Sequence, residues 1–165
     1  MKKFRILQGL ALLSCAIIFM ACPYNSNVPL STADTKAPAF LIGTWEKQDD
    51  ATIQVEIKQG GGNSLDVIKT TKSEDSEPTI ENYTVHVTDI NGTMFLNVSE
   101  KTEYEPSYYF YKVIREGENK MTLSGVTENI REKFEDSGAM KKFFAANMQN
   151  SYFYDATDES YFKLK

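Results

Sequence analysis

Few residues in this chain have the type and spacing that catalysis requires. The single histidine, His86, lies in Thr84-Val85-His86-Val87-Thr88 and shares a strand face with the two threonines. We expect it to face solvent, because side chains alternate between the two faces of a strand. With one histidine in the chain, a Ser-His-Asp arrangement has no support.

Three pairs of adjacent acids are the other candidates for acid–base chemistry: Asp49-Asp50, Glu74-Asp75 and Asp158-Glu159. Paired carboxylates can serve glycoside hydrolysis, but each pair lies in a polar segment, where solvated loop acids are the simpler interpretation. The chain has no Cys-x-x-Cys, His-Glu-x-x-His or Gly-x-x-x-x-Gly-Lys motif. We therefore expect no metal site, no cofactor and no enzymatic activity.

The most specific chemical signal is at the N-terminus, where Cys22 follows an apolar leader. The leader opens with three basic residues, Lys2, Lys3 and Arg5. An apolar stretch over residues 10–20 follows, which is typical of a secretory signal peptide. This stretch is shorter than the run of about 18 residues that a lasting membrane span requires.

The leader ends in Phe19-Met20-Ala21-Cys22, which resembles the lipobox of bacterial lipoproteins. That resemblance implies a lipoprotein signal peptide over residues 1–22 that is cut ahead of Cys22, and thioether linkage of Cys22, as the new N-terminus, to diacylglycerol. It also implies a lipid-anchored protein of the bacterial cell envelope, on its periplasmic or outer surface. An ordinary signal peptidase site is the alternative. The lipoprotein is favoured because Cys22 would otherwise be a lone thiol in an oxidising compartment.

Composition and charge exclude other classes of partner. The chain has 165 residues, of which 41% are hydrophobic and 25% charged, as in a single globular domain. The full chain has 18 basic and 23 acidic residues. Loss of Lys2, Lys3 and Arg5 with the leader would remove three of the basic residues and give the mature chain a net charge of −8. This balance argues against nucleic acid and against electrostatic adhesion to anionic lipid, so membrane attachment would depend on the acyl chains.

The composition changes again after the leader. Residues 23–39 are rich in Asn, Ser, Thr, Pro and Ala, so we expect a flexible tether there. The folded domain then covers residues 40–165, where polar and apolar residues alternate along short segments bounded by turn residues. Eight strands are predicted: 44–47, 52–58, 64–70, 80–88, 93–100, 107–115, 120–126 and 161–165.

One segment before the last strand has helical rather than strand periodicity. Its helically spaced residues are Ala139, Met140, Phe143, Phe144, Asn147 and Met148, with Asp136 or Ser137 as the N-cap. An earlier helical turn is expected within residues 127–134. The order of elements predicts a mainly β fold, an antiparallel barrel of about eight strands with one amphipathic helix before the last strand.

Gly43-Thr44-Trp45 at the start of the first strand resembles the Gly-x-Trp signature of lipocalins and related barrel proteins. The order of strands, helix and final strand over residues 40–165 is similar as well. The resemblance implies that Trp45 packs across the closed end of a barrel. It also implies a basic residue near the last strand that covers the tryptophan, a place that Lys163 could take.

Aromatic residues on one strand give the remaining functional signal. Tyr109, Tyr111 and Val113 share a face that we assign to the barrel interior, so Phe110 would meet the helix or solvent. The candidate ligand-lining residues are Trp45, Tyr109, Tyr111 and Phe143. Two functions stay open: a tethered module that binds a small apolar or amphipathic ligand, and a structural or protein-interaction domain of the envelope whose core is filled.

Overall fold

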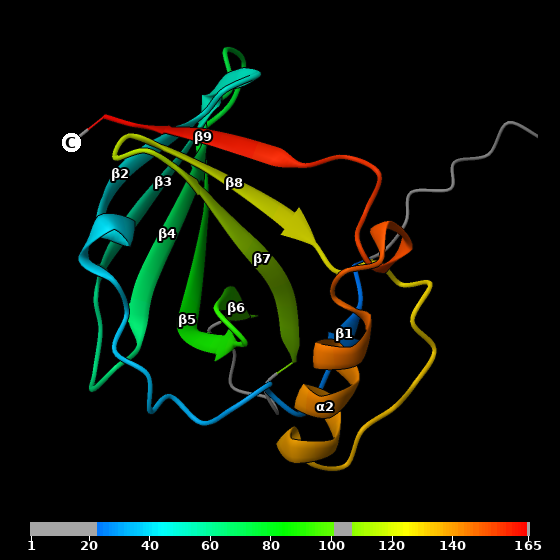
Figure 1. Ribbon diagram of the computed structural model, residues 1–165. Helices are drawn as coiled ribbons and strands as arrows, with labels where there is room; N and C mark the ends of the chain where they lie inside the picture. Colours follow the sequence, from blue (N-terminus) through cyan, green and yellow to red (C-terminus); the bar gives the residue numbers. More distant parts are fainter. Residues whose placement is uncertain (1–22, 101–106, 165) are drawn as a thin grey trace, which may run out of the picture.

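The computed structural model describes residues 23–100 and 107–164 (Figure 1). The predicted leader and Cys22 lie outside the described residues. The described chain forms a closed eight-stranded antiparallel β-barrel with one helix before the last strand, as the sequence predicted, and this architecture is consistent with a calycin-like barrel. Its strands are β2 (Gly43–Lys47), β3 (Asp50–Gln59), β4 (Leu65–Thr71), β5 (Thr79–Ile90), β6 (Thr93–Glu100), β7 (Tyr108–Glu116), β8 (Lys120–Gly125) and β9 (Glu159–Lys163).

The barrel is a sequence of neighbouring hairpins that closes through the last strand. Each strand from β2 to β8 pairs antiparallel with the next, and β9 pairs with both β8 and β2. The β5–β6 turn uses Asn91 with φ 54° and Gly92 with φ 81°, the left-handed pair expected from Asn-Gly. Closure leaves no unpaired edge, which removes the usual route to edge-to-edge aggregation.

The helix α2 (Ser137–Asn147) packs on the outer wall of the barrel (Figure 1). Asp136 caps it through a hydrogen bond of 2.8 Å that Ala139 N donates to the carboxylate. Phe144 contacts Phe95 and Phe110 with ring centroids 5.6 and 5.4 Å apart. Phe110 therefore meets the helix, as its place opposite Tyr109 and Tyr111 predicted.

The segment before the helix has an irregular backbone, and the segment after it contains a short 3-10 helix, η2 (Ser151–Phe153). Residues 128–134 form a turn and then an irregular loop, so the helical turn expected within 127–134 is wrong. Ile130 and Phe134 nonetheless pack against the outer cluster. Two apolar side chains can be buried by a loop that crosses the helix, and they need no helical backbone for it.

Residues 23–37, here called the N-terminal strap, run along the barrel and do not form the flexible tether that their composition predicted. β1 (Asn25–Ser26) pairs with the start of β7, and Tyr24 N donates to Val126 O over 2.9 Å. Tyr24 and Leu30 are buried in the cluster under the helix. Composition misled here because a few apolar residues suffice to fix a segment whose backbone finds hydrogen-bond partners on a neighbouring wall.

A buried polar cluster fastens the strap to β5 and β6. Leu30 N donates to Asn97 Oδ1 over 2.7 Å, and Asn97 Nδ2 donates to Thr88 Oγ1 over 2.9 Å. His86 Nε2 lies 2.8 Å from Ser31 O, and because a carbonyl only accepts, Nε2 carries the proton. His86 is 7% exposed, so its expected solvent-facing position is wrong: the strap covers this face of the sheet.

The histidine makes the stability of the fold depend on pH. Burial lowers the pKa of His86 from its usual 6.5. As pH falls through 6.5, the unfolded chain takes up a proton there before the folded protein does, so the free energy of unfolding should fall and then level off below the folded pKa. Urea unfolding at about pH 7.5 and about pH 5.5 checks this. A His86→Gln variant should lose that part of the dependence, and an unchanged dependence would contradict it.

Candidate ligand cavity

The barrel interior holds a cavity of about 510 Å³, a volume that is typical of small-molecule sites. Its lining includes Lys47, at the end of β2, and Glu159, at the start of β9, and we call this end of the barrel the mouth. The cavity lies inside the barrel and not under α2, because the aromatic cluster of Phe95, Phe110 and Phe144 occupies the space beneath the helix.

The deeper wall of the cavity is mainly apolar. Its aliphatic lining comes from five strands and from Leu41, and consists of Leu41, Ile53, Val55, Ile57, Leu65, Val67, Val85, Leu96, Val98, Met121 and Leu123. The lining residues that lie on strands occupy alternate positions. They therefore share one face of each strand, and this face turns inward. Such a wall favours apolar ligand groups and excludes water from them.

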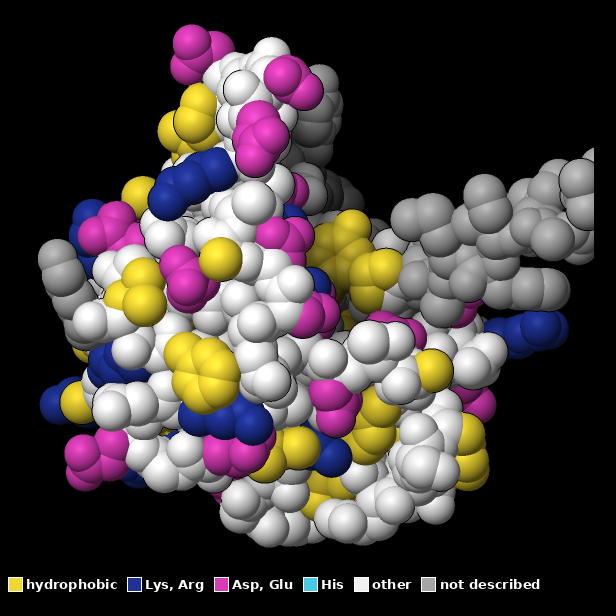
Figure 2. Space-filling model, turned by 90° about the horizontal axis from the view of Figure 1, so that it is seen from above, with side chains coloured by type: hydrophobic (Ala, Val, Ile, Leu, Met, Phe, Trp, Pro, Cys, Tyr) yellow, Lys and Arg dark blue, Asp and Glu magenta, His cyan; other side chains and the backbone are white. Residues whose placement is uncertain are grey.

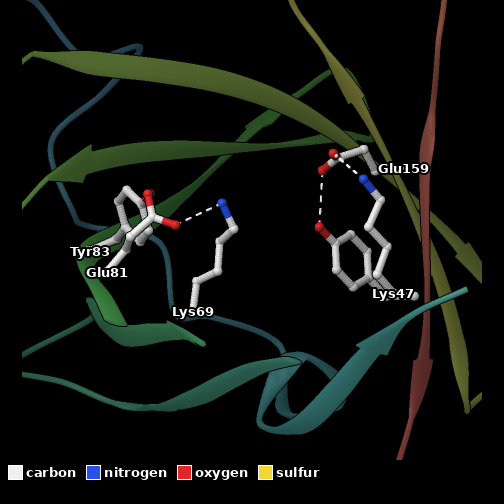
Figure 3. A network of polar contacts seen from close by, with 6 residues as sticks. Lys47, Lys69, Glu81, Tyr83 and Glu159 are labelled. Carbon is white, nitrogen blue, oxygen red and sulfur yellow. Dashed lines mark hydrogen bonds and ion pairs between the residues drawn. The ribbon is translucent and has the colours of Figure 1, made fainter. Parts of the chain in front are cut away.

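Two clusters of the same composition stand at the mouth, and we call them the Lys–Glu–Tyr triads. Lys47 Nζ lies 2.8 Å from Glu159 Oε1, and Tyr161 OH donates to Glu159 Oε2 over 3.0 Å. Figure 3 shows the second ion pair on the opposite side of the interior, where Lys69 meets Glu81. The two triads therefore present cations, carboxylates and phenols toward the same space.

The second triad repeats the pattern of the first. Lys69 Nζ lies 2.8 Å from Glu81 Oε2, and Tyr83 OH donates to Glu81 Oε1 over 2.9 Å. In both triads the tyrosine follows its glutamate by two positions, so both side chains share the inner face of one strand. The lysine comes from the neighbouring strand in each case, from β2 beside β9 and from β4 beside β5.

Local interactions keep these groups in their usual charge states. The Glu159 hydrogen bond raises the pKa of Lys47, and the Lys69 hydrogen bond, with that of Tyr83, lowers the pKa of Glu81. Burial, reinforced by Glu159, raises the pKa of Tyr161, and burial raises the pKa of Tyr111 to about 12. Around neutral pH Lys47 and Glu81 are thus charged, and the phenols of Tyr111 and Tyr161 carry their protons.

The structure brings two of the four predicted lining residues to the cavity. Tyr109 and Tyr111 line it, together with Tyr83 and Tyr161. Phe143 does not: it belongs to the outer cluster, with its ring 5.3 Å from Phe134. The helical spacing placed Phe143 correctly on the apolar face of α2, but that face covers the outside of the wall.

Trp45 is fully buried among the interior residues but is not part of the cavity lining. Its Nε1 donates to Leu41 O over 2.8 Å, and Leu41 itself lines the cavity. Lys163 Nζ lies 5.3 Å from the centre of the indole ring and donates to Phe40 O over 2.9 Å. Lys163 thus takes the covering position that the Gly-x-Trp resemblance implied.

Sequence reasoning missed the charged residues of the mouth. Glu159 was taken as part of a solvated acid pair, yet it faces the cavity while Asp158 is exposed. A signal was present: Lys47, Lys69 and Glu81 stand two positions from Trp45, Val67 and Tyr83, which places each of them on an inward strand face.

Comparison with known proteins leaves the cavity as the main guide to function. No protein-family model, no curated protein and no solved structure matches the chain. Within residues 23–100 and 107–164, no group of three or more His, Cys, Asp or Glu side chains is placed to hold a metal ion. Over the same residues, no helix is long and apolar enough to cross a membrane.

Proposed function

We propose that this protein binds a small amphipathic molecule inside its barrel, with the apolar part in the cavity and the polar part at the mouth. The observation that carries the proposal is the cavity itself. A filled core would leave little space between the strands, whereas about 510 Å³ lies within the range of about 300–1,000 Å³ that ligand sites occupy. We propose no catalytic role for the site.

The described surface gives less support to a protein-interaction domain with a filled core. Exposed large hydrophobic residues are few among the described residues and are spread over several segments: Ile80, Ile114, Tyr152, and Phe162 with Leu164 at the end of β9. Seen from above, acidic and basic side chains are interspersed and hydrophobic ones are scattered between them (Figure 2). A docking face would instead gather apolar area into one patch of several hundred Å².

We further propose that acyl chains on Cys22 hold the domain at a membrane of the bacterial cell envelope. The support is the sequence of the leader, since Cys22 lies outside the described residues. Pro23, the next residue, lines the cavity. An anchor attached one residue earlier would therefore keep the opening of the cavity near the lipid surface, where amphipathic molecules concentrate.

Filling the cavity should abolish binding without unfolding the barrel. Val98 lies on the inner face of β6, and Val98→Trp adds a large side chain to the space that a ligand would occupy. We expect the affinity for a fluorescent apolar dye to fall at least about tenfold. Fluorescence titration of the full chain measures this, with circular dichroism to verify the fold.

Ile114→Trp is the matched control, because Ile114 is 39% exposed on the outside of β7. It should leave dye affinity unchanged. Native mass spectrometry of the protein from its own cell envelope should then find a small molecule on the wild type and none on Val98→Trp. Two results together would contradict the proposal: no ligand on the wild-type protein, and a dye affinity that Val98→Trp leaves unchanged. They would support the interaction domain with a filled core instead.

A further inference from the structure

The charges at the mouth constrain what kind of polar head the cavity accepts. Among the described residues, the lining contains Lys47, Lys69 and Glu159, and Glu81 is bonded to Lys69. Within the two triads, the two cations and two anions cancel. Both pairs are partly shielded from water. Side-chain exposures are 18% for Lys47 and 40% for Glu159 in one pair, and 35% for Lys69 and 36% for Glu81 in the other.

A ligand that carried a net charge would disturb this balance. An anionic head beside either lysine would also meet the carboxylate that the lysine already holds at 2.8 Å. A cationic head beside either glutamate would meet the ammonium in the same way. Repulsion at these separations is strong where solvent screening is incomplete, and dehydration of the charged head adds to the cost.

An uncharged head with several hydroxyl groups avoids both costs. A lysine ammonium has three N–H donors, so each lysine can donate to a ligand oxygen without releasing its glutamate. Each carboxylate oxygen has two lone pairs, and can accept from a ligand hydroxyl while it keeps its lysine or tyrosine. Hydroxyl groups both donate and accept, which matches a site where donors and acceptors stand side by side (Figure 3).

From the two balanced triads above an apolar cavity, we infer that the ligand is an uncharged amphiphile with a polyhydroxyl, sugar-like head and an apolar tail. This inference rests on the proposed ligand-binding function and specifies its ligand class. The tail occupies the aliphatic lining, and the head bonds to the triads. The phenol rings of Tyr83 and Tyr161 add apolar faces and hydroxyls that suit a sugar ring.

Probes with the same octyl tail and different heads test this. The full chain, free of other detergents, is titrated calorimetrically with octyl glucoside, octanoate, octylammonium and an octyl oligo(ethylene glycol) ether, each below its micellar concentration. Octyl glucoside should bind at least about tenfold more tightly than either charged probe, and more tightly than the ether, which is uncharged but poor in donors.

Removing one glutamate charge should shift the preference of the cavity toward the anionic probe. Glu81→Gln leaves Lys69 without its carboxylate and gives the mouth a net positive charge, so the octanoate-to-glucoside affinity ratio should rise about tenfold. Glu159→Gln, in the other triad, should do the same through Lys47. Glu116→Gln is the matched control: this glutamate also pairs with a lysine, Lys120, but lies on the outer β7–β8 hairpin, and the ratio should not move.

The outcomes separate this inference from the function on which it rests. If all octyl probes bind equally well, or if octanoate binds best to the wild type, the assigned ligand class is wrong while ligand binding stands. Unchanged ratios in both Glu81→Gln and Glu159→Gln would also overturn the assignment. If no octyl probe binds the wild type at all, the ligand-binding function itself fails.

Discussion

Replacing Trp45 with alanine is expected to lower the free energy of unfolding by about 3–5 kcal/mol, the range for truncating a fully buried large aromatic residue. The indole is completely buried, and its Nε1 donates to Leu41 O over 2.8 Å. Truncation leaves that carbonyl without its donor and removes the ring beneath Lys163. Urea unfolding measured by far-ultraviolet circular dichroism gives the difference.

A conservative variant divides this loss into its parts. Trp45→Phe keeps most of the apolar volume but removes the Nε1 donor, so it should cost less than Trp45→Ala, about 1–3 kcal/mol. Tyr152→Ala, at a residue that is 67% exposed, serves as the control and should change stability by less than about 0.5 kcal/mol. Equal effects of Trp45→Ala and Tyr152→Ala would show that the closed end does not depend on the indole.

Replacing Asn97 with leucine should cost about 2–4 kcal/mol and loosen the N-terminal strap. Asn97 is completely buried, accepts from Leu30 N over 2.7 Å and donates to Thr88 Oγ1 over 2.9 Å. Leucine has a similar volume but leaves the buried Leu30 N without its acceptor, at a cost of about 1–3 kcal/mol. It also removes one of two partners of Thr88 Oγ1, which keeps its hydrogen bond of 2.6 Å with Ser31 Oγ. Hydrogen exchange should show faster exchange of the amides of residues 24–31 than in the wild type, with β3 and β4 unchanged.

Asn63→Leu is the matched control. Asn63 also holds the backbone of the strap, through a hydrogen bond from Nδ2 to Asp34 O of 3.0 Å, but that bond is exposed. Water can replace the lost partner there, so stability should change by less than about 1 kcal/mol. Asn97→Leu and Asn63→Leu could instead change stability and the hydrogen exchange of the strap equally. Burial of the polar cluster would then not explain how the strap is held.

The sequence predicted the barrel well where its signals were local. Alternation along residues 52–58 predicted β3, Asn91-Gly92 predicted the turn of the β5–β6 hairpin, and Asp136 was one of two candidate caps for α2. Each signal depends on the conformation of a few adjacent residues. Such signals identify elements and turns without knowledge of what lies across the fold.

Predictions of burial were less successful where a residue is covered by a segment that is distant in sequence. His86 was expected on an exposed face because its own strand gave no indication of the strap that covers it. Phe143 was assigned to the cavity because an apolar helix face can pack inside or outside a barrel wall. Glu159 was assigned to solvent because a charge is usually exposed, although its partner Lys47 is 112 positions away in sequence.

By itself, the sequence determined the strands, the turns between them, the helix with two candidates for its cap, and the tryptophan motif, since backbone preference and side-chain alternation operate over neighbouring residues. Only the tertiary structure decided that a cavity remains inside the barrel, that two Lys–Glu–Tyr triads meet at its mouth, and that the strap covers β5 and β6. The cavity, the Lys47–Glu159 pair and the contact of the strap with β6 each join segments that are distant in the chain. Their existence depends on how the sheet closes and how completely side chains fill the enclosed volume, which no local pattern specifies.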